Sequence, residues 1–481
     1  MVGARLITRV FDLVTMLVLA RILQPTDFGL VAIAMTLVSI VEAALELPLN
    51  QALLRLPVIT AAQYDTAFTL SALRGLLLTL IVVLASWPFA GFYADDRLVP
   101  LVCMLSIAPT ARGLTSPRLA KYHKEMNFWR DFAIELAGKL IGFTVGLGIA
   151  ILTRSYWSIA AGVVAYPLAM AIGSYVLAPY RPRLSLAESH LFSGFIGWTT
   201  AAQIVSALNW QFERLLLGKL QATSQLGLFA TASDLANIPV LALFSPIMRP
   251  ILAAFSQLRN EDGRLARSYQ TASSAIVMVG VPLLVGESLL AEPIVLLILG
   301  EKWRGAIPLL RWLSVSLIPG LFALPAVPLV MFFGKTEIIL KRNLVEFCIK
   351  TPILIIGVLN FGFAGVIFSR FLSEAISVVF WMNVVRRLVG LSIADQLLAS
   401  WRAVLSTVIM IAPVLLCLRQ IPVGGGTSEI ALGLIITASI GATVYGAALY
   451  TLWVFSGYPS GIESLLVNKL GSSINKRQKP T

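Results

Sequence analysis

The basic side chains inside long apolar segments are the residues of this sequence with the most distinctive chemistry. Four of them have no acidic residue within four positions: Arg74, Arg112, Arg249 and Arg311. A basic group at the centre of a membrane helix costs roughly 2.5 to 3.5 kcal/mol, and a guanidinium fork matches the oxygens of phosphate. We interpret these four, with Arg214 beside Glu213, as candidates for binding an anion in a polar interior. Pairing with another helix and reaching the membrane surface are the alternatives.

Three further basic residues are interpreted as structural. Each has an acidic residue four positions away on the same helix face: Glu135 with Lys139, Glu346 with Lys350, and Arg370 with Glu374. Such a pair neutralises itself, so it needs no ligand from outside the chain.

The sequence lacks the residue sets of common enzyme and metal sites. Its two histidines, His123 and His190, lie in polar segments, so neither a histidine metal site nor a Ser-His-Asp triad is expected in the apolar ones. Residues 334–336 end like a phosphate-binding loop, but Leu329 stands in place of its leading glycine. The three cysteines are scattered through apolar runs, which favours buried thiols over disulfides. We predict no catalytic residue, cofactor or metal.

Composition places these residues in a membrane. Hydrophobic residues make up 58% of the 481 residues and charged residues only 13%, with a mean hydropathy of +0.85. Soluble chains carry about 25% charged residues. The net charge of +13 follows the loops between apolar runs, so it indicates topology rather than binding to nucleic acid.

Fourteen apolar runs are long enough to be spanning helices. They cover residues 7–23, 28–49, 67–90, 99–116, 131–152, 157–178, 194–218, 226–247, 272–299, 306–333, 344–359, 363–385, 403–420 and 430–455. With this count, twenty-two loop Lys and Arg residues fall on the side of the two termini and seven on the other. Because basic loops stay in the cytoplasm, we expect both termini to be cytoplasmic.

A turn between two apolar helices occurs twice. Residues 19–34 read LARILQPTDFGLVAIA, and residues 217–232 read LGKLQATSQLGLFATA at a constant offset of 198, with five identities. We therefore predict an all-α integral membrane protein with two tandem six-helix bundles around a central cavity and two additional helices. The predicted domains are residues 1–185, 186–390 and 391–460, followed by a basic cytoplasmic tail at 461–481.

Helix breakers and small residues refine this expectation. Prolines are expected to kink or break the eighth, ninth and tenth spans at Pro239, Pro246, Pro250, Pro282, Pro319, Pro325 and Pro328. A ridge of glycines at positions 138, 142 and 146 is expected to pack closely against another helix.

Several blocks of the sequence resemble the polysaccharide transporters of the multidrug/oligosaccharidyl-lipid/polysaccharide exporter superfamily. The run LARILQPTDFGLVAIA is similar to their signature, and further blocks match in order at 67–93, 117–135, 226–240, 245–272 and 300–314. The resemblance covers roughly residues 1–390. Phe229 stands where the family often has Tyr, and Glu213 where it often has Asp.

The resemblance implies a flippase rather than an enzyme. Its substrate would be oligosaccharide repeat units on undecaprenyl pyrophosphate, moved across the bacterial inner membrane by alternating access for exopolysaccharide, capsule or O-antigen synthesis. Under this hypothesis Arg74 and Arg311 approach the pyrophosphate, and Glu42, Glu46 or Asp234 carries a coupling proton or sodium ion. A polysaccharide polymerase and a chain-length regulator are the protein partners that the resemblance implies.

Two other functions fit parts of the sequence. A membrane-embedded glycan polymerase or ligase would act on the same lipid-linked sugars, but it needs a large external loop, and the external loops are short. Asp95 and Asp96 form the one acidic pair in such a loop, next to Arg97. A drug exporter of the wider superfamily would favour an acidic, aromatic cavity over one that holds arginines without local partners.

Overall fold

The protein is helical throughout the part of the chain that the structure describes, which confirms the predicted all-α class. The computed structural model describes residues 2–47, 49–56, 58–193, 198–258, 262–420, 426–458 and 464. Apart from Ser464, the predicted tail at 461–481 lies outside these ranges.

Eleven helices of the described residues are long and apolar enough to cross a membrane. The other three predicted spans correspond to different elements: 7–23 to α1 (Val2–Ile22), 99–116 to α5 (Leu98–Leu105) and α6 (Ile107–Gly113), and 194–218 to α11 (Trp198–Leu220). The chain is thus a multi-pass membrane protein, but the exact count of fourteen spans is not confirmed. Hydropathy did not reveal the break between α5 and α6 at Ser106, whose carbonyl accepts a hydrogen bond from Thr79.

The chain divides into two compact units. Unit 1 comprises Met1–Thr231 and Ile339–Val366, and unit 2 comprises Ala232–Ile338 and Ile367–Thr481. The predicted domain limits at residues 185 and 390 remain predictions.

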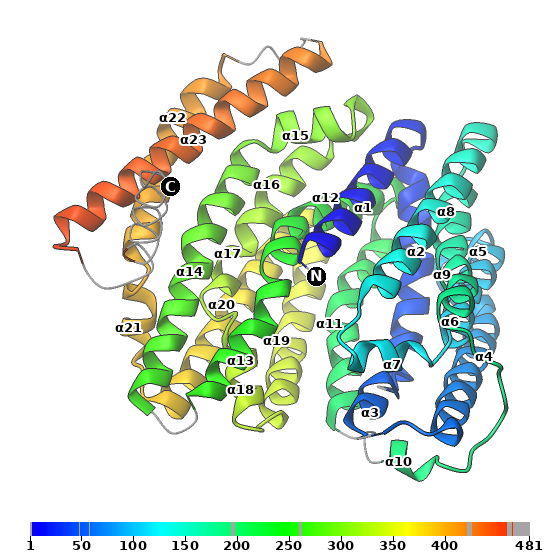
Figure 1. The fold of residues 1–481 in the computed structure, drawn as a ribbon. Helices are drawn as coiled ribbons and strands as arrows, with labels where there is room; N and C mark the ends of the chain where they lie inside the picture. Colours follow the sequence, from blue (N-terminus) through cyan, green and yellow to red (C-terminus); the bar gives the residue numbers. More distant parts are fainter. Residues whose placement is uncertain are drawn as a thin grey trace, which may run out of the picture. The chain divides into compact units, whose positions relative to one another are not determined.

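Unit 1 contains all the described residues of the first predicted bundle (Figure 1). Besides α1, α5, α6 and α11, its elements are α2 (Pro25–Ala44), α3 (Leu49–Arg55), α4 (Ala61–Tyr93), α7 (Leu119–Lys124), α8 (Trp129–Thr153), α9 (Trp157–Leu177), α10 (His190–Ser193) and most of α19 (Glu337–Phe361). Helix α8 packs along α9, and α2 packs on α11 and α5. The predicted glycine ridge is confirmed, because a Cβ on Gly142 would lie 2.9 Å from the carbonyl oxygen of Gly162 on α9.

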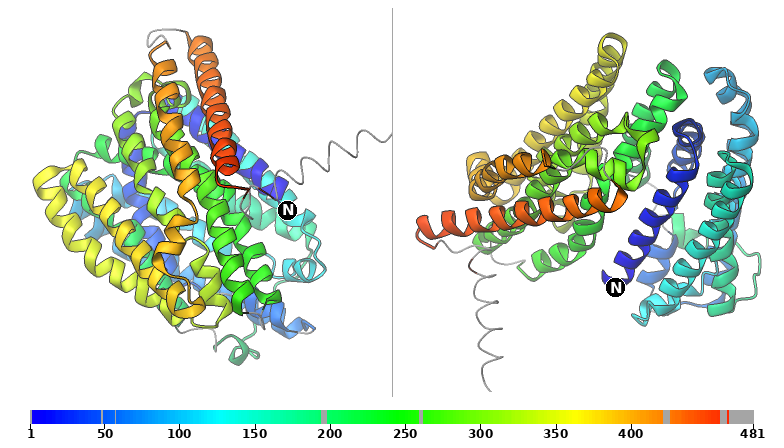
Figure 2. Two further views of the ribbon diagram at one scale, coloured as in Figure 1. Left: turned by 90° about the vertical axis from the view of Figure 1, so that its left-hand side faces the viewer. Right: turned by 90° about the horizontal axis from the view of Figure 1, so that it is seen from above.

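Unit 2 contains most of α12 (Thr223–Leu243) and of α20 (Phe363–Val389). Its other elements are η1 (Ser245–Ile247), α13 (Met248–Gln257), α14 (Asp262–Leu289), α15 (Ala291–Ile298), η2 (Glu301–Trp303), α16 (Ala306–Ser316), α17 (Ile318–Leu321), α18 (Ala326–Phe332), α21 (Ile393–Leu398), α22 (Trp401–Leu418) and α23 (Thr427–Phe455). Helices α22 and α23 lie side by side as a hairpin (Figure 2). Proline breaks divide the predicted tenth span into α16, α17 and α18, whereas Pro239 and Pro282 lie inside helices.

Local chemistry explains the turn that opens α2. Gln24 is the N-cap, Pro25 occupies the first turn, and the Asp27 carboxylate accepts a hydrogen bond from the Gln24 N–H at 2.9 Å. This reciprocal arrangement satisfies donors that a helix start leaves free.

The two copies of the repeated turn touch each other inside unit 1. A Cβ on Gly29 would lie 1.9 Å from the carbonyl oxygen of Thr223, and a Cβ on Gly227 would lie 1.8 Å from that of Pro25. Pro25 and Thr223 are equivalent at the offset of 198, as are Gly29 and Gly227. The contact is therefore reciprocal, and only glycine permits the two backbones to approach this closely.

Candidate functional site

Two glycines bring α4 and α6 together and so determine where two predicted arginines lie. A Cβ on Gly75 would lie 2.9 Å from the Cα of Thr110, and a Cβ on Gly113 would lie 2.4 Å from the carbonyl oxygen of Ser71. The Thr110 hydroxyl donates to the Gly75 carbonyl at 2.8 Å. Arg74 and Arg112 each precede one of these glycines, so the close helix contact places both side chains in the same region of unit 1.

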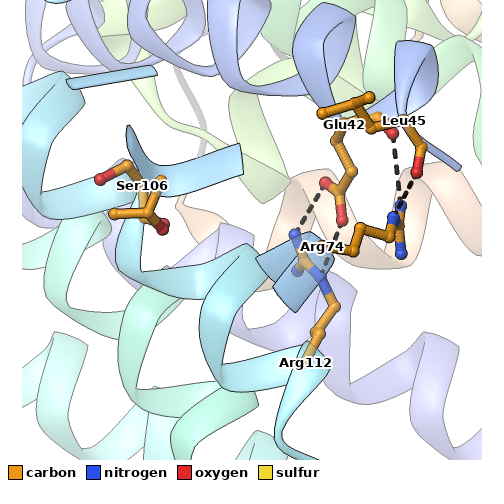
Figure 3. A network of polar contacts seen from close by, with 6 residues as sticks. Glu42, Leu45, Arg74, Ser106 and Arg112 are labelled. Atoms are coloured by element: carbon orange, nitrogen blue, oxygen red, sulfur yellow. Dashed lines mark hydrogen bonds and ion pairs between the residues drawn. The ribbon is translucent and has the colours of Figure 1, made fainter. Parts of the chain in front are cut away.

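Both arginines meet the C-terminal turn of α2 (Figure 3). Arg112 Nε and Nη2 donate to the two carboxylate oxygens of Glu42 at 3.0 and 2.8 Å. Arg74 Nε donates to the carbonyl of Leu45 at 2.5 Å, and its Nη2 donates to the carbonyl of Glu42 at 3.3 Å. Because the last carbonyls of a helix lack partners within it and carry partial negative charge, Arg74 caps α2.

We call Glu42, Arg74 and Arg112 the arginine cluster. The Arg112 and Glu42 side chains are 43% and 30% exposed, so the protein does not enclose the ion pair. Glu46, exposed just beyond the end of α2, is close enough to act electrostatically on Arg74. Two positive and two negative groups thus share this region, and their formal charges cancel.

The structure places the remaining predicted residues on separate elements. In unit 1, Arg214 lies on α11 and is partly buried. In unit 2, three predicted residues are exposed: Arg249 on α13, Arg311 on α16 and Asp234 on α12. Of the predicted site residues, the structure connects Glu42, Arg74 and Arg112 by hydrogen bonds, and the roles of all the predicted residues remain predictions.

A second polar network in unit 1 was not predicted. Lys350 on α19 forms an ion pair of 2.6 Å with Glu213 on α11, and these side chains are only 10% and 6% exposed. Lys350 also donates to the carbonyl of Asn209 at 3.0 Å, and the Asn209 amide donates to the carbonyl of Asn343 at 2.9 Å. The family position at which Glu213 stands is therefore part of a buried ion pair between two helices.

Of the expected pairs four residues apart, one forms and one is replaced. Lys139 lies 3.8 Å from Glu135 as predicted, and it also contacts Asp12 on α1 at 2.6 Å. Glu346, expected to pair with Lys350, instead pairs with Arg342 at 2.6 Å. Residue spacing predicted the contact of Lys139 with Glu135, but neither the pairing of Glu346 with Arg342 nor the partners on neighbouring helices.

Asp95, of the acidic pair predicted to be external, has a local partner. Arg97 donates from Nε and Nη2 to the Asp95 carboxylate at 2.9 and 2.7 Å, and this hydrogen bonding holds the pKa of Asp95 below its usual value. Asp95 therefore serves to form the turn before α5.

Comparison with known proteins gives the family. Residues 18–308 match the family described as polysaccharide biosynthesis protein, which is more than half of the chain. The chain belongs to this family. It is 25% identical to the lipopolysaccharide biosynthesis protein WzxC of Escherichia coli K12 over 398 residues, which cover 81% of this chain and 80% of WzxC. It is 22% identical to the succinoglycan biosynthesis transport protein ExoT of Rhizobium meliloti over 437 residues, covering 90% and 87% of the two chains.

Two solved structures of membrane transport proteins share this fold. The structure of the lipid II flippase MurJ in an inward closed conformation aligns with a TM-score of 0.71 at 13% identity, covering 94% of this chain and 98% of MurJ. An inward-facing multidrug transporter of the MATE family aligns with a TM-score of 0.62 at 14% identity, covering 80% and 94%. MurJ is named as a flippase, the MATE protein as a transporter and ExoT as a transport protein, in agreement with the prediction of a transport protein rather than an enzyme.

Proposed function

We propose that this protein is a flippase for undecaprenyl-pyrophosphate-linked oligosaccharide repeat units in the bacterial inner membrane. The observation that carries the proposal is the arginine cluster, in which the partly exposed Arg112 guanidinium binds a carboxylate on α2, a helix long and apolar enough to cross a membrane. Relatives named for lipopolysaccharide and succinoglycan biosynthesis, together with the MurJ-like fold, support a lipid-linked glycan as the cargo.

Pyrophosphate suits the chemistry of the cluster. A guanidinium carries five N–H donors, and phosphoryl oxygens bind two of them in parallel. Arg112 lies where such an anion can enter, while Arg74 fixes the end of α2 beside it. The lipid tail stays in the bilayer, so the protein needs polar contacts only for the head group and the glycan.

The other predicted residues have proposed roles in the same cycle. Arg214, Arg249 and Arg311 are further contacts for the pyrophosphate or glycan as the bundles change conformation. A proton or sodium ion drives the cycle through Glu42, Glu46 or Asp234.

The remaining features of the proposal concern topology and partners. The two bundles, residues 1–185 and 186–390, alternate access, residues 391–460 form the additional helices, and both termini are cytoplasmic. A polysaccharide polymerase and a chain-length regulator act on the exported repeat units.

Reconstitution tests this proposal. Purified protein in liposomes receives a labelled undecaprenyl-pyrophosphate oligosaccharide, ion gradients are imposed, and exposure of inner-leaflet label is followed together with the mass of the glycan. The proposal predicts faster exposure at unchanged mass. A longer glycan would instead identify a polymerase, and no acceleration by folded protein with its cognate glycan would contradict a flippase.

A further inference from the structure

The bidentate pair between Glu42 and Arg112 occupies one of the guanidinium edges that a phosphoryl group can use. Both carboxylate oxygens of Glu42 lie on the Nε and Nη2 edge of Arg112, at 3.0 and 2.8 Å. Carboxylate and phosphate oxygens bind this edge with the same fork geometry. A phosphoryl group can take this edge only when the Glu42 carboxylate leaves it.

The pair is held in place but open to exchange. Arg74 holds the backbone carbonyls of Glu42 and Leu45, so the end of α2 that carries the carboxylate is fixed beside α4. Yet Arg112 and Glu42 are 43% and 30% exposed, so protein atoms do not enclose either charge. Removing the carboxylate from Arg112 therefore leaves no charge enclosed within the protein.

The net charge around Arg112 affects how the Glu42 carboxylate and a phosphoryl group exchange there. With Arg74, Arg112, Glu42 and Glu46 ionised, the region is neutral, so it attracts a pyrophosphate weakly until a carboxylate gives way. When the anion departs, Glu42 can return to Arg112 and restore neutrality. The carboxylate thereby weakens binding and eases release, which a carrier needs on the far side of the membrane.

We infer that Glu42 is an exchangeable counter-anion of the phosphate site, which holds Arg112 between cargoes and is displaced by a phosphoryl group of the substrate. The inference rests on the proposed function and adds to it a residue that weakens binding of the anion and so eases its release. It assigns Glu42 a positioning role through Arg112, distinct from carrying a coupling ion.

Binding of inorganic pyrophosphate to the purified full chain in detergent tests the inference by calorimetry. Glu42→Gln is expected to bind about fivefold more tightly than wild type, since the exposed pair no longer competes. Glu46→Gln removes a charge from the same region without touching Arg112, so a smaller gain is expected. Equal gains in both variants, or an unchanged or weaker affinity in Glu42→Gln, would overturn the inference.

A double-mutant cycle guards against indirect effects. With Arg112→Gln as background, adding Glu42→Gln is expected to change pyrophosphate affinity less than twofold, because the shared guanidinium is gone. A full fivefold gain in that background would contradict competition at Arg112. If Glu42→Gln does not fold, Glu42→Asp replaces it, and its shorter side chain is expected to give an intermediate gain; no gain in a folded Asp variant would count against the inference.

The liposome assay separates this inference from the function on which it rests. If wild-type protein flips the glycan but Glu42→Gln binds pyrophosphate no more tightly than wild type, the flippase function stands and the counter-anion role of Glu42 is contradicted. If wild-type protein neither flips the glycan nor binds pyrophosphate, both the flippase function and the counter-anion role are contradicted.

Discussion

The charged side chains of unit 1 are arranged in two different ways. Arg112 and Glu42 form an ion pair that the protein leaves partly exposed, whereas Lys350 and Glu213 are almost entirely buried. An exposed pair is easily exchanged, while a buried pair whose partner is lost leaves an uncompensated charge. The first arrangement suits a binding site and the second suits a fixed connection between helices.

The buried pair gives a prediction for stability. Lys350→Ala is expected to destabilise the protein by about 3 to 5 kcal/mol, because it leaves the Glu213 carboxylate buried without its ammonium partner. The double variant Glu213→Gln with Lys350→Met is expected to lose less. Chemical unfolding in detergent measures both, and the exposed pair of Glu301 and Arg304 supplies the control, since Glu301→Gln should unfold like wild type. If Lys350→Ala were as stable as the double variant, this explanation would be contradicted.

Sequence predicted the charged residues of the site but not their partners. A charge in an apolar run is visible from composition, and pairs four residues apart follow from helix geometry, as for Glu135 and Lys139. The partner of Arg112 lies 70 residues away, on a helix brought near by packing. No local spacing contains that information.

At the scale of elements, glycines determine which helices touch and hence where the arginines lie. Hydropathy located the helices because a spanning segment needs about 20 apolar residues. The four-residue spacing of glycines predicted the ridge of α8, because that spacing follows the helix period. The contact of α4 with α6 depends on single glycines, Gly75 and Gly113, which form no repeating pattern in the sequence.

Gly113→Ala tests this positioning. Its Cβ would lie 2.4 Å from a backbone oxygen on α4, so α6 must shift and Arg112 with it, at a cost of about 1 to 3 kcal/mol. The temperature of thermal unfolding and the affinity for pyrophosphate should both fall. Gly91→Ala is the matched control, because a Cβ at Gly91 on α4 meets nothing within 4 Å. Wild-type behaviour of Gly113→Ala in both measurements would show that α6 tolerates the shift.

At the scale of the whole molecule, the two sequence repeats carry one reciprocal contact. The repeat was visible at an offset of 198, but its two copies could have lain anywhere in the fold. Inside unit 1, Gly29 meets Thr223 and Gly227 meets Pro25. Equivalent residues therefore form both halves of the contact, as expected for duplicated elements that meet across a pseudo-two-fold axis.

This reciprocity predicts paired effects. Gly29→Ala and Gly227→Ala should lower the thermal unfolding temperature by similar amounts, because each Cβ would lie within 2 Å of an equivalent backbone oxygen. Gly148→Ala on α8, where a Cβ meets nothing within 4 Å, should be neutral. A large effect from one crossing glycine and none from the other would contradict an equivalent contact.

The central claim is that the arginine cluster recognises the pyrophosphate of a lipid-linked glycan during flipping. The most direct measurement compares flipping rates in liposomes for wild type, Arg112→Gln, Arg74→Ala and Arg304→Gln, an exposed arginine paired with Glu301 outside the cluster. With equal amounts of folded, inserted protein, we predict at least about a tenfold loss for Arg112→Gln, a loss for Arg74→Ala, and the full rate for Arg304→Gln. Full-rate flipping by the Arg112 and Arg74 variants would contradict the claim and place recognition elsewhere in the protein.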